Sequence, residues 1–216
     1  MKLLVIISSH VFDQSCYDNI KILNDYMQNN DMEVDYCGIS NQNDFYIFEP
    51  IISFKYKIIN TKKQLCKICD FITDYKSELD YDWYMKIRPE VKLLDTISFD
   101  ILSKNAINAR ARVYNGPLKI KYGISVNGEG CWRNIGDCKY DDYEHDIVLD
   151  DMLYIFHKNI VLQNAFDKIS STITEPQHEW MHRDTFTKRN ISLNVVGIHL
   201  CFTKNNTISG NINLDI

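Results

Sequence analysis

The chain has 216 residues, of which 45% are hydrophobic and 25% charged, a composition typical of soluble globular proteins. This length suffices for one large domain or two tightly packed subdomains around a continuous core. The formal net charge of −5 argues against nucleic-acid binding, although a local basic pocket for an anion stays compatible with it. The apolar run Leu3–Ile7 is too short for a signal peptide or a membrane span, so we expect a cytoplasmic protein.

The first third of the sequence has the pattern of a β-α-β unit. Residues 2–8 form a continuous apolar run typical of a buried parallel strand. An amphipathic helix follows, and residues 32–37 predict a second strand. The apolar positions of this helix, at helical spacing, are Ile20, Leu23, Tyr26 and Met27.

Residues 38–60 are irregular, with strand-like pieces at 45–48 and 51–58. A second helix is predicted from about residue 61 to residue 79, with Thr61 as its N-cap. Its inner face contains Leu65, Ile68, Cys69 and Ile72.

The second half of the chain predicts a mixture of helices and strands. The expected elements are a short helix at 97–104, strands at 106–113 and 152–157, helices at 159–173 and 179–189, and a strand at 192–202. Five glycines between Gly116 and Gly136 indicate a loop region. The whole pattern favours an α/β fold with a Rossmann-like N-terminal half and a mixed sheet flanked by helices.

Cysteine usage favours reduced thiols, because the chain contains seven Cys, an odd number. Cys66 and Cys69 form a Cys-x-x-Cys pair within the second helix, but no second pair stands at zinc-binding spacing. Since the two thiols share one helix face, we interpret them as small buried apolar residues.

The most informative segment is 81–92, where an alternating pattern over 83–87 suits a strand. Pro89 cannot donate to a sheet, so pairing should stop there. Arg88 and Glu90 are therefore expected at the carboxyl edge of a strand, where open α/β sheets bind their ligands. A guanidinium binds phosphate and a carboxylate binds a divalent cation or a ribose hydroxyl. The alternative is a simple ion pair at the surface.

Several common nucleotide and hydrolase motifs are absent from the sequence. No G-x-G-x-x-G follows the first strand, no Walker loop occurs, and no G-x-S-x-G elbow is present. The sequence therefore does not favour a dinucleotide oxidoreductase, a P-loop kinase or an α/β-hydrolase.

The order of the remaining segments resembles the GT-A-type nucleotide-sugar glycosyltransferases, in the compact form of large DNA viruses. The segments that carry this resemblance are Leu3–His10, the helix with Lys62, Lys63 and Lys67, the run Lys86–Val91, and the pair Asp150–Tyr154 and His178–Trp180. Lys86–Val91 is similar to the Arg-Pro-Asp version of the family's Asp-x-Asp motif. The resemblance implies a single GT-A-like domain over 1–216, with a nucleotide-binding half at 1–92 and an acceptor-side half at 93–216.

The resemblance also implies a reaction, in which a sugar moves from a nucleotide-diphosphate sugar to a hydroxyl of a glycan or another acceptor. Such a transfer must stabilise a departing diphosphate and take a proton from the acceptor. The resemblance places Ser8, Ser9 and His10 at the nucleotide, Lys63, Arg88 and Glu90 at the diphosphate, and Glu179 or Asp151 as the base. With Glu179 as base, the transfer is expected to invert the sugar.

A divalent cation, Mn²⁺ or Mg²⁺, is implied as well, with Glu90 and His199 as its candidate ligands. The chain departs from the family here, because Glu90 replaces the usual Asp and Arg88 replaces the first acid. Since an arginine neutralises a diphosphate without any cation, metal-dependent and metal-free forms both stay open.

Each of these roles has a structural alternative. Asp150 and Asp151 suit a capped loop, Glu179 suits the first turn of a helix, and His199 lies between apolar residues as a core histidine does. The corresponding alternative function is a catalytically silent domain that binds nucleotide-sugar or glycan within a larger assembly. A purely structural viral protein is disfavoured, because the charged residues gather at predicted strand ends.

Overall fold

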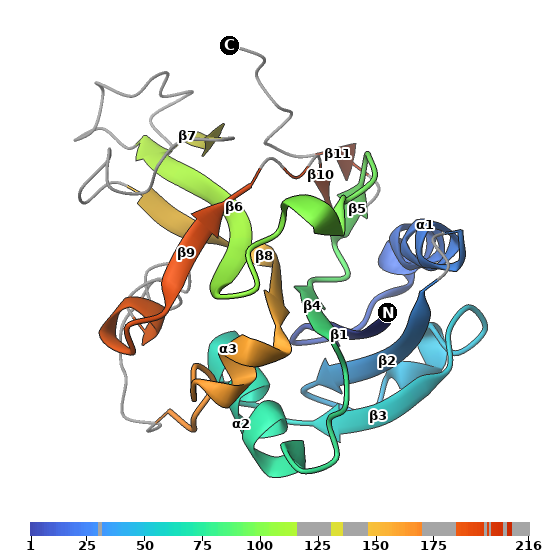
Figure 1. The fold of residues 1–216 in the computed structure, drawn as a ribbon. Helices are drawn as coiled ribbons and strands as arrows, with labels where there is room; N and C mark the ends of the chain where they lie inside the picture. The colour runs from blue at the N-terminus through green and yellow to red at the C-terminus, as the bar shows by residue number, and fades with distance from the viewer. Residues whose placement is uncertain are drawn as a thin grey trace.

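The structure is a computed structural model that describes residues 1–29, 32–115, 131–135, 147–169, 185–196, 198, 200–204 and 207–208. Its main feature is an eight-stranded sheet in the order β3-β2-β1-β4-β8-β6-β7, with β9 paired to β6 (Figure 1). A smaller three-stranded sheet has the order β11-β10-β5.

The strands of the main sheet are β1 (Lys2–Ser8), β2 (Glu33–Ser40), β3 (Phe54–Ile59), β4 (Trp83–Ile87), β6 (Ala106–Asn115), β7 (Cys131–Ile135), β8 (Ile147–His157) and β9 (Ser192–Val195). The small sheet consists of β5 (Val91–Leu93), β10 (Leu200–Lys204) and β11 (Thr207–Ile208). Helices α1 (Tyr17–Gln28), α2 (Gln64–Tyr75) and α3 (Lys158–Leu162) connect the strands.

The N-terminal half is parallel, as the Rossmann-like pattern predicts. Strand β1 pairs in parallel with β2 on one side and with β4 on the other, and β3 extends the sheet beyond β2. Strand β4 then pairs antiparallel with β8, so the second half makes the sheet mixed. The predicted α/β fold class is confirmed, and the functional division at residues 92 and 93 stays a prediction.

The sheet carries an apolar core on each of its faces. Leu3, Val5 and Ile7 of β1 belong to the core on the α1 side, whereas Leu4 and Ile6 belong to the core that α2 and α3 cover. Figure 1 shows α1 on one side of the parallel strands and α2 with α3 on the other. This burial on both faces explains why β1 reads as an uninterrupted apolar run. No helix among the described residues has the length and apolar character that a membrane crossing requires.

The strand-like piece expected at 45–48 is instead a 3₁₀ turn, Phe45–Ile47. Phe45 and Phe48 are both buried while Tyr46 between them is 67% exposed, a spacing of three that suits a helical turn. Phe45 and Phe48 pack around the ring of Phe12, so tertiary contacts outweigh the strand preference of this segment.

The helix expected at 159–173 is also shorter, since α3 ends at Leu162. Asn164 has a positive φ of 62° and ends the helix in a Schellman arrangement. The amide of Asn164 donates to the carbonyl of Val161, and that of Ala165 to the carbonyl of Ile160. Asparagine tolerates this left-handed conformation better than most residues, which is the local reason for the early stop.

Three other predicted elements differ from the structure. The helix expected at 97–104 is only a 3₁₀ turn, Phe99–Ile101, and α2 begins at Gln64 with Lys63 rather than Thr61 at its N-cap. The single strand expected at 192–202 is two strands, because β9 pairs with β6 and β10 pairs with β5 in the other sheet. Of the helix expected at 179–189, residues 185–189 are described, and 185–188 are helical.

Gly38 in β2 packs directly against the aromatic rings of Phe45 and Phe54, so a substitution here measures how tightly they pack. A Cβ at this position would lie 2.9 Å from ring atoms of both Phe45 and Phe54. We expect Gly38→Ala to destabilise the protein by about 1–3 kcal/mol, because the rings must move. Urea unfolding measures the change. In a Phe45→Leu background, which makes room, the same substitution should cost clearly less, and equal costs in both backgrounds would contradict this account.

Candidate functional site

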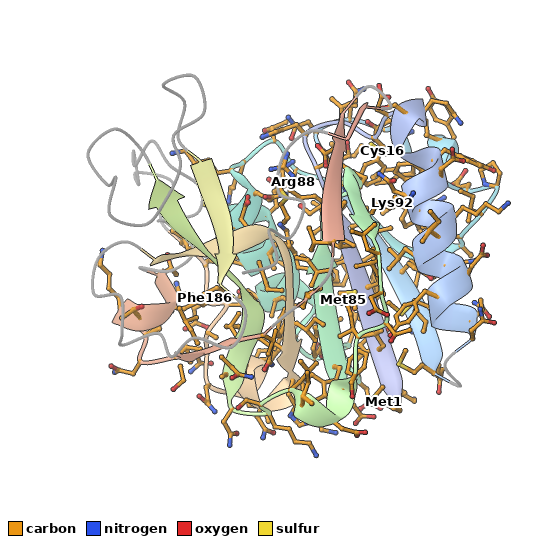
Figure 2. All side chains as sticks on the ribbon, turned by 90° about the horizontal axis from the view of Figure 1, so that it is seen from above. Met1, Cys16, Met85, Arg88, Lys92 and Phe186 are labelled. Atoms are coloured by element: carbon orange, nitrogen blue, oxygen red, sulfur yellow. The ribbon has the colours of Figure 1, made fainter. Side chains whose placement is uncertain are left out.

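The candidate site lies where the strand order of the parallel sheet reverses. The chain adds β2 and β3 on one side of β1, and then returns to place β4 on the other side. At such a point the loops after the two central strands diverge and leave a crevice at the carboxyl ends. Figure 2 shows Arg88, directly after β4, near the same end of the sheet as Cys16 and Lys92, with Met1 at the opposite end.

A cavity of about 200 Å³ opens at this edge. Four parts of the chain contribute to it: the loop after β1, the start of α2, the residue after β4, and β8. The lining residues are Ser9, His10, Gln64, Lys67, Arg88 and Asp151. The cavity is therefore polar and charged, with both cations and a carboxylate on its wall.

The turn after β4 is held rigidly. The amide of Arg88 donates to the carbonyl of Met152 in β8, 2.9 Å away, which is the last sheet bond of this edge. The next residue, Pro89, has no amide hydrogen, so β4 ends there as predicted. The side chain of Asn19 in α1 is buried and donates to the carbonyl of Pro89 at 3.1 Å. The backbone position of Arg88 is thereby fixed by both a strand and a helix.

The guanidinium of Arg88 lies between two carboxylates. Its Nη2 is 3.2 Å from Oε1 of Glu90, and its Nε is 3.5 Å from Oε2 of the same side chain. On the other side, Nη1 lies 3.8 Å from Oδ2 of Asp151. The ion pair between Arg88 and Glu90 that the alternative interpretation predicts is thus present, but it is partly buried and the guanidinium side chain borders a cavity. Burial raises the pKa of the nearby Cys16 thiol to about 11; the negative charge of Glu90 adds to this shift, and the positive charge of Arg88 opposes it.

Asp151 owes its position to an irregularity in β8. The pairing of β8 with β6 places Ala109 opposite Tyr154 and Ala111 opposite Leu149, so one residue of β6 faces four residues of β8. Bulges of this kind redirect side chains and are frequent beside active sites. The ammonium of Lys86 in β4 donates to the backbone oxygen of Asp151 within the bulge. Both Lys86 and Asp151 are almost fully buried.

The α2 wall of the cavity is built by two polar residues one turn apart. The amide of Gln64 donates to the carbonyl of Ser8 at 2.9 Å. The ammonium of Lys67 donates to the carbonyl of Ser9 and to Oδ1 of Asn41, both at 2.6 Å. Burial lowers the pKa of Lys67 to about 8. Both side chains leave α2 on the face that meets the end of β1.

The structure brings together four of the predicted site residues, since Ser9, His10, Arg88 and Asp151 all line the cavity. Ser8 is buried behind it, and Glu90 contacts Arg88. Lys63 is the N-cap of α2 and is not among the lining residues. Glu179 and His199 lie outside the described residues, so their predicted roles stay predictions.

Sequence reasoning missed Gln64, and it named Lys67 and Lys86 only as members of the segments that carry the resemblance, without a role of their own. The spacing of Gln64 and Lys67 at the start of a helix, next to the end of β1, was the available signal. For Lys86 the signal was weaker, because a lysine in a strand is normally assigned to an exposed face.

The described residues contain no group of three or more His, Cys, Asp or Glu side chains that would hold a metal ion. Of the predicted metal ligands, Glu90 has both carboxylate oxygens near the guanidinium of Arg88. The described part of the site therefore does not fit a divalent cation without another ligand. The metal prediction stays a prediction.

Comparison with known proteins adds information about the fold. No protein-family model matches the sequence, and no curated protein is similar to it in sequence. Among solved structures, one similar chain is a Bacillus anthracis protein assigned as a glucose-1-phosphate thymidylyltransferase and bound to sucrose. It has a TM-score of 0.51 and 10% identity, over 93% of this chain and 89% of that chain.

Two further structures are less similar. The inositol-1-phosphate CTP transferase from T. maritima has a TM-score of 0.49 and 11% identity, over 90% of this chain and 84% of that chain. A197 from STIV has a TM-score of 0.47 and 10% identity, over 100% of this chain and 98% of that chain. The likeness to the Bacillus anthracis structure shows that the chain shares its α/β architecture, and at this identity it shows the fold alone.

Proposed function

We propose that the protein binds a nucleotide-diphosphate sugar in the cavity at the ends of β1 and β4 and transfers the sugar to a hydroxyl of a glycan or another acceptor. The observation that supports this most is the meeting of Arg88 and Asp151 at one cavity, at the point where the strand order reverses. Ligands of open α/β sheets bind at such points.

The phosphate side of the reaction requires positive charge. When the bond between sugar and diphosphate breaks, negative charge grows on the leaving diphosphate, and fixed cations stabilise it. Arg88 suits this role because its backbone is anchored and its planar guanidinium binds phosphate oxygens in pairs. Ser9 and His10 follow β1 and line the same cavity, so we assign them in this proposal to contacts with the remainder of the nucleotide.

The acceptor side requires a group that removes a proton from the attacking hydroxyl. Asp151 is the carboxylate that lines the described part of the cavity, and its backbone is held by Lys86. We therefore assign Asp151 as the base in this proposal, with Glu179 as the alternative from the sequence. An inverting transfer follows if one of these carboxylates activates the acceptor directly.

Two other functions fit the same cavity. The first is nucleotidyl transfer, which the name of the Bacillus anthracis protein suggests. The second is a catalytically silent domain that binds a nucleotide-sugar or a glycan. An assay distinguishes them: free nucleoside diphosphate from a panel of nucleotide-sugars supports glycosyl transfer, pyrophosphate from a nucleoside triphosphate and a sugar phosphate supports nucleotidyl transfer, and binding without product supports the silent domain.

Arg88 is the first residue to test. We expect Arg88→Ala to weaken the binding of a nucleoside diphosphate by roughly ten- to a hundred-fold, as the loss of a charge-assisted hydrogen bond does. Arg88→Lys keeps the charge without the planar fork and should give an intermediate loss. Calorimetry with a panel of diphosphates measures the affinity, and thermal unfolding checks that both variants fold. Unchanged affinity in a folded Arg88→Ala protein would reject the assignment.

The base is tested by removing one charge at a time. Asp151→Asn should reduce the transfer rate by at least about a hundred-fold while donor affinity stays within a few-fold of the wild type. Glu179→Gln is the matched variant for the other candidate. Rates are compared by product release at saturating donor. If both variants transfer sugar at the wild-type rate, neither carboxylate is the base.

The metal requirement is tested at Glu90. If Glu90 holds a divalent cation, Mn²⁺ should tighten nucleotide binding in the wild type but not in Glu90→Ala, and a chelator should remove the effect. Calorimetry with Mn²⁺ and with the chelator provides the comparison. Equal affinity under both conditions would favour neutralisation of the diphosphate by protein cations alone.

A further inference from the structure

Lys67 is a buried lysine whose hydrogen bonds are incomplete. The residue is fully buried, at 0% exposure, and it lines the cavity. Two of the three N–H groups donate, one to the carbonyl of Ser9 and one to the amide oxygen of Asn41. Within the part of the chain that the structure describes, the third N–H has no protein acceptor.

The position of Lys67 is also unfavourable for a positive charge. It lies at the start of the twelve-residue helix α2, where the helix dipole favours anions and disfavours cations. Both of its hydrogen-bond acceptors are neutral, and among the described carboxylates that of Asp44 acts on it electrostatically without forming an ion pair. An uncharged side chain would bridge the same two loops without burying a charge. The link between Ser9 and Asn41 therefore does not explain why this residue is charged, and the carboxylate of Asp44 compensates the buried charge only in part.

We propose that Lys67 is an anion-binding residue of the cavity, whose third N–H donates to an ionised phosphoryl oxygen of a bound ligand while the other two hold the ends of β1 and β2. The choice of a phosphoryl group rests on the proposed function, whereas the need for an anion rests on the buried charge alone. Arg88 on the opposite part of the wall would then share the same phosphate group.

The surroundings of Lys67 make this binding dependent on pH. Burial lowers the pKa of Lys67 to about 8, and the carboxylate of Asp44 offsets part of that effect. The other charged or titratable groups near it are His10, Arg88 and Asp151 around the cavity, and Lys63 and Asp70 on its own helix. An anion favours the protonated amine, so binding above neutral pH should draw a proton onto Lys67.

The first experiment removes the charge and keeps the length of the side chain. We expect Lys67→Met to weaken the binding of inorganic pyrophosphate, measured by calorimetry near about pH 7, by roughly ten- to a hundred-fold. The matched control is Lys76→Met at the other end of α2, where the exposed ammonium bonds to Asn164 outside the cavity. This control should bind pyrophosphate as the wild type does.

Urea unfolding of the same proteins separates a ligand contact from a purely structural role. If Lys67→Met is less stable than the wild type but binds pyrophosphate equally well, Lys67 only links the two loops and the proposal is overturned. That result would leave the proposed function standing, because the roles of Arg88 and Asp151 do not depend on Lys67. If the wild type binds neither pyrophosphate nor any nucleoside diphosphate, the proposed function fails together with the proposal.

The second experiment needs no variant and therefore does not depend on the folding of one. Sulfate is used as the probe because its charge does not change near neutral pH. Its affinity for the wild type should fall by about tenfold between about pH 7 and pH 9, as Lys67 loses its proton. Guanidinium and carboxylate groups do not titrate in that range, and an unperturbed imidazole such as that of a histidine in the cavity has lost its charge by about pH 8, so the fall between about pH 8 and pH 9 reports Lys67. An affinity that is constant over the range would overturn the proposal.

Discussion

The antiparallel pairing of β4 with β8 is the constraint on which the site depends. Strand β4 is buried along its whole length and pairs with β1 on its other side. Its end therefore lies beside the end of β1 and beside the middle of β8. Because the pairing stops at Arg88 and Met152, the next residues of both strands turn into the same space. Arg88 and Asp151, distant in the sequence, meet there for this reason.

Two lysines on the α2 side of the sheet, Lys67 and Lys86, are buried beside the candidate site, and burying a charge costs free energy. Lys86 satisfies its ammonium at the carbonyl of Asp151 and lies 5.4 Å from the centre of the Tyr154 ring, so its contacts stabilise the bulge and the cation together. Lys67 has only two neutral oxygens as acceptors. The contacts of Lys86 are thus explained by the fold, whereas Lys67 has only partial compensation, from the carboxylate of Asp44. This difference is the reason for our proposal that Lys67 binds an anion in the cavity.

The strand ends at the candidate site could be predicted from the sequence better than the residues that line the cavity. The uninterrupted apolar run of β1 and the stop at Pro89 are local signals, so the ends of β1 and β4 were placed correctly. The bulge that positions Asp151 depends on the register between β8 and β6, which no local pattern encodes. The burial of Lys67 likewise depends on how α2 meets the end of β1. Charged residues on a helix are normally exposed, so Lys63 was as good a candidate as Lys67 from sequence alone.

The charges around the cavity determine whether protein side chains alone could balance a bound diphosphate or whether a metal ion is also required. Arg88 carries one positive charge between the carboxylates of Glu90 and Asp151, so this group alone cannot balance a diphosphate. In the proposed sugar transfer, negative charge on the ligand increases further when the sugar leaves, and a cation must compensate it. A divalent ion and a protonated Lys67 both supply that charge. Because the amine of Lys67 already lies at the cavity, its protonated form would reduce the need for a metal in the proposed reaction.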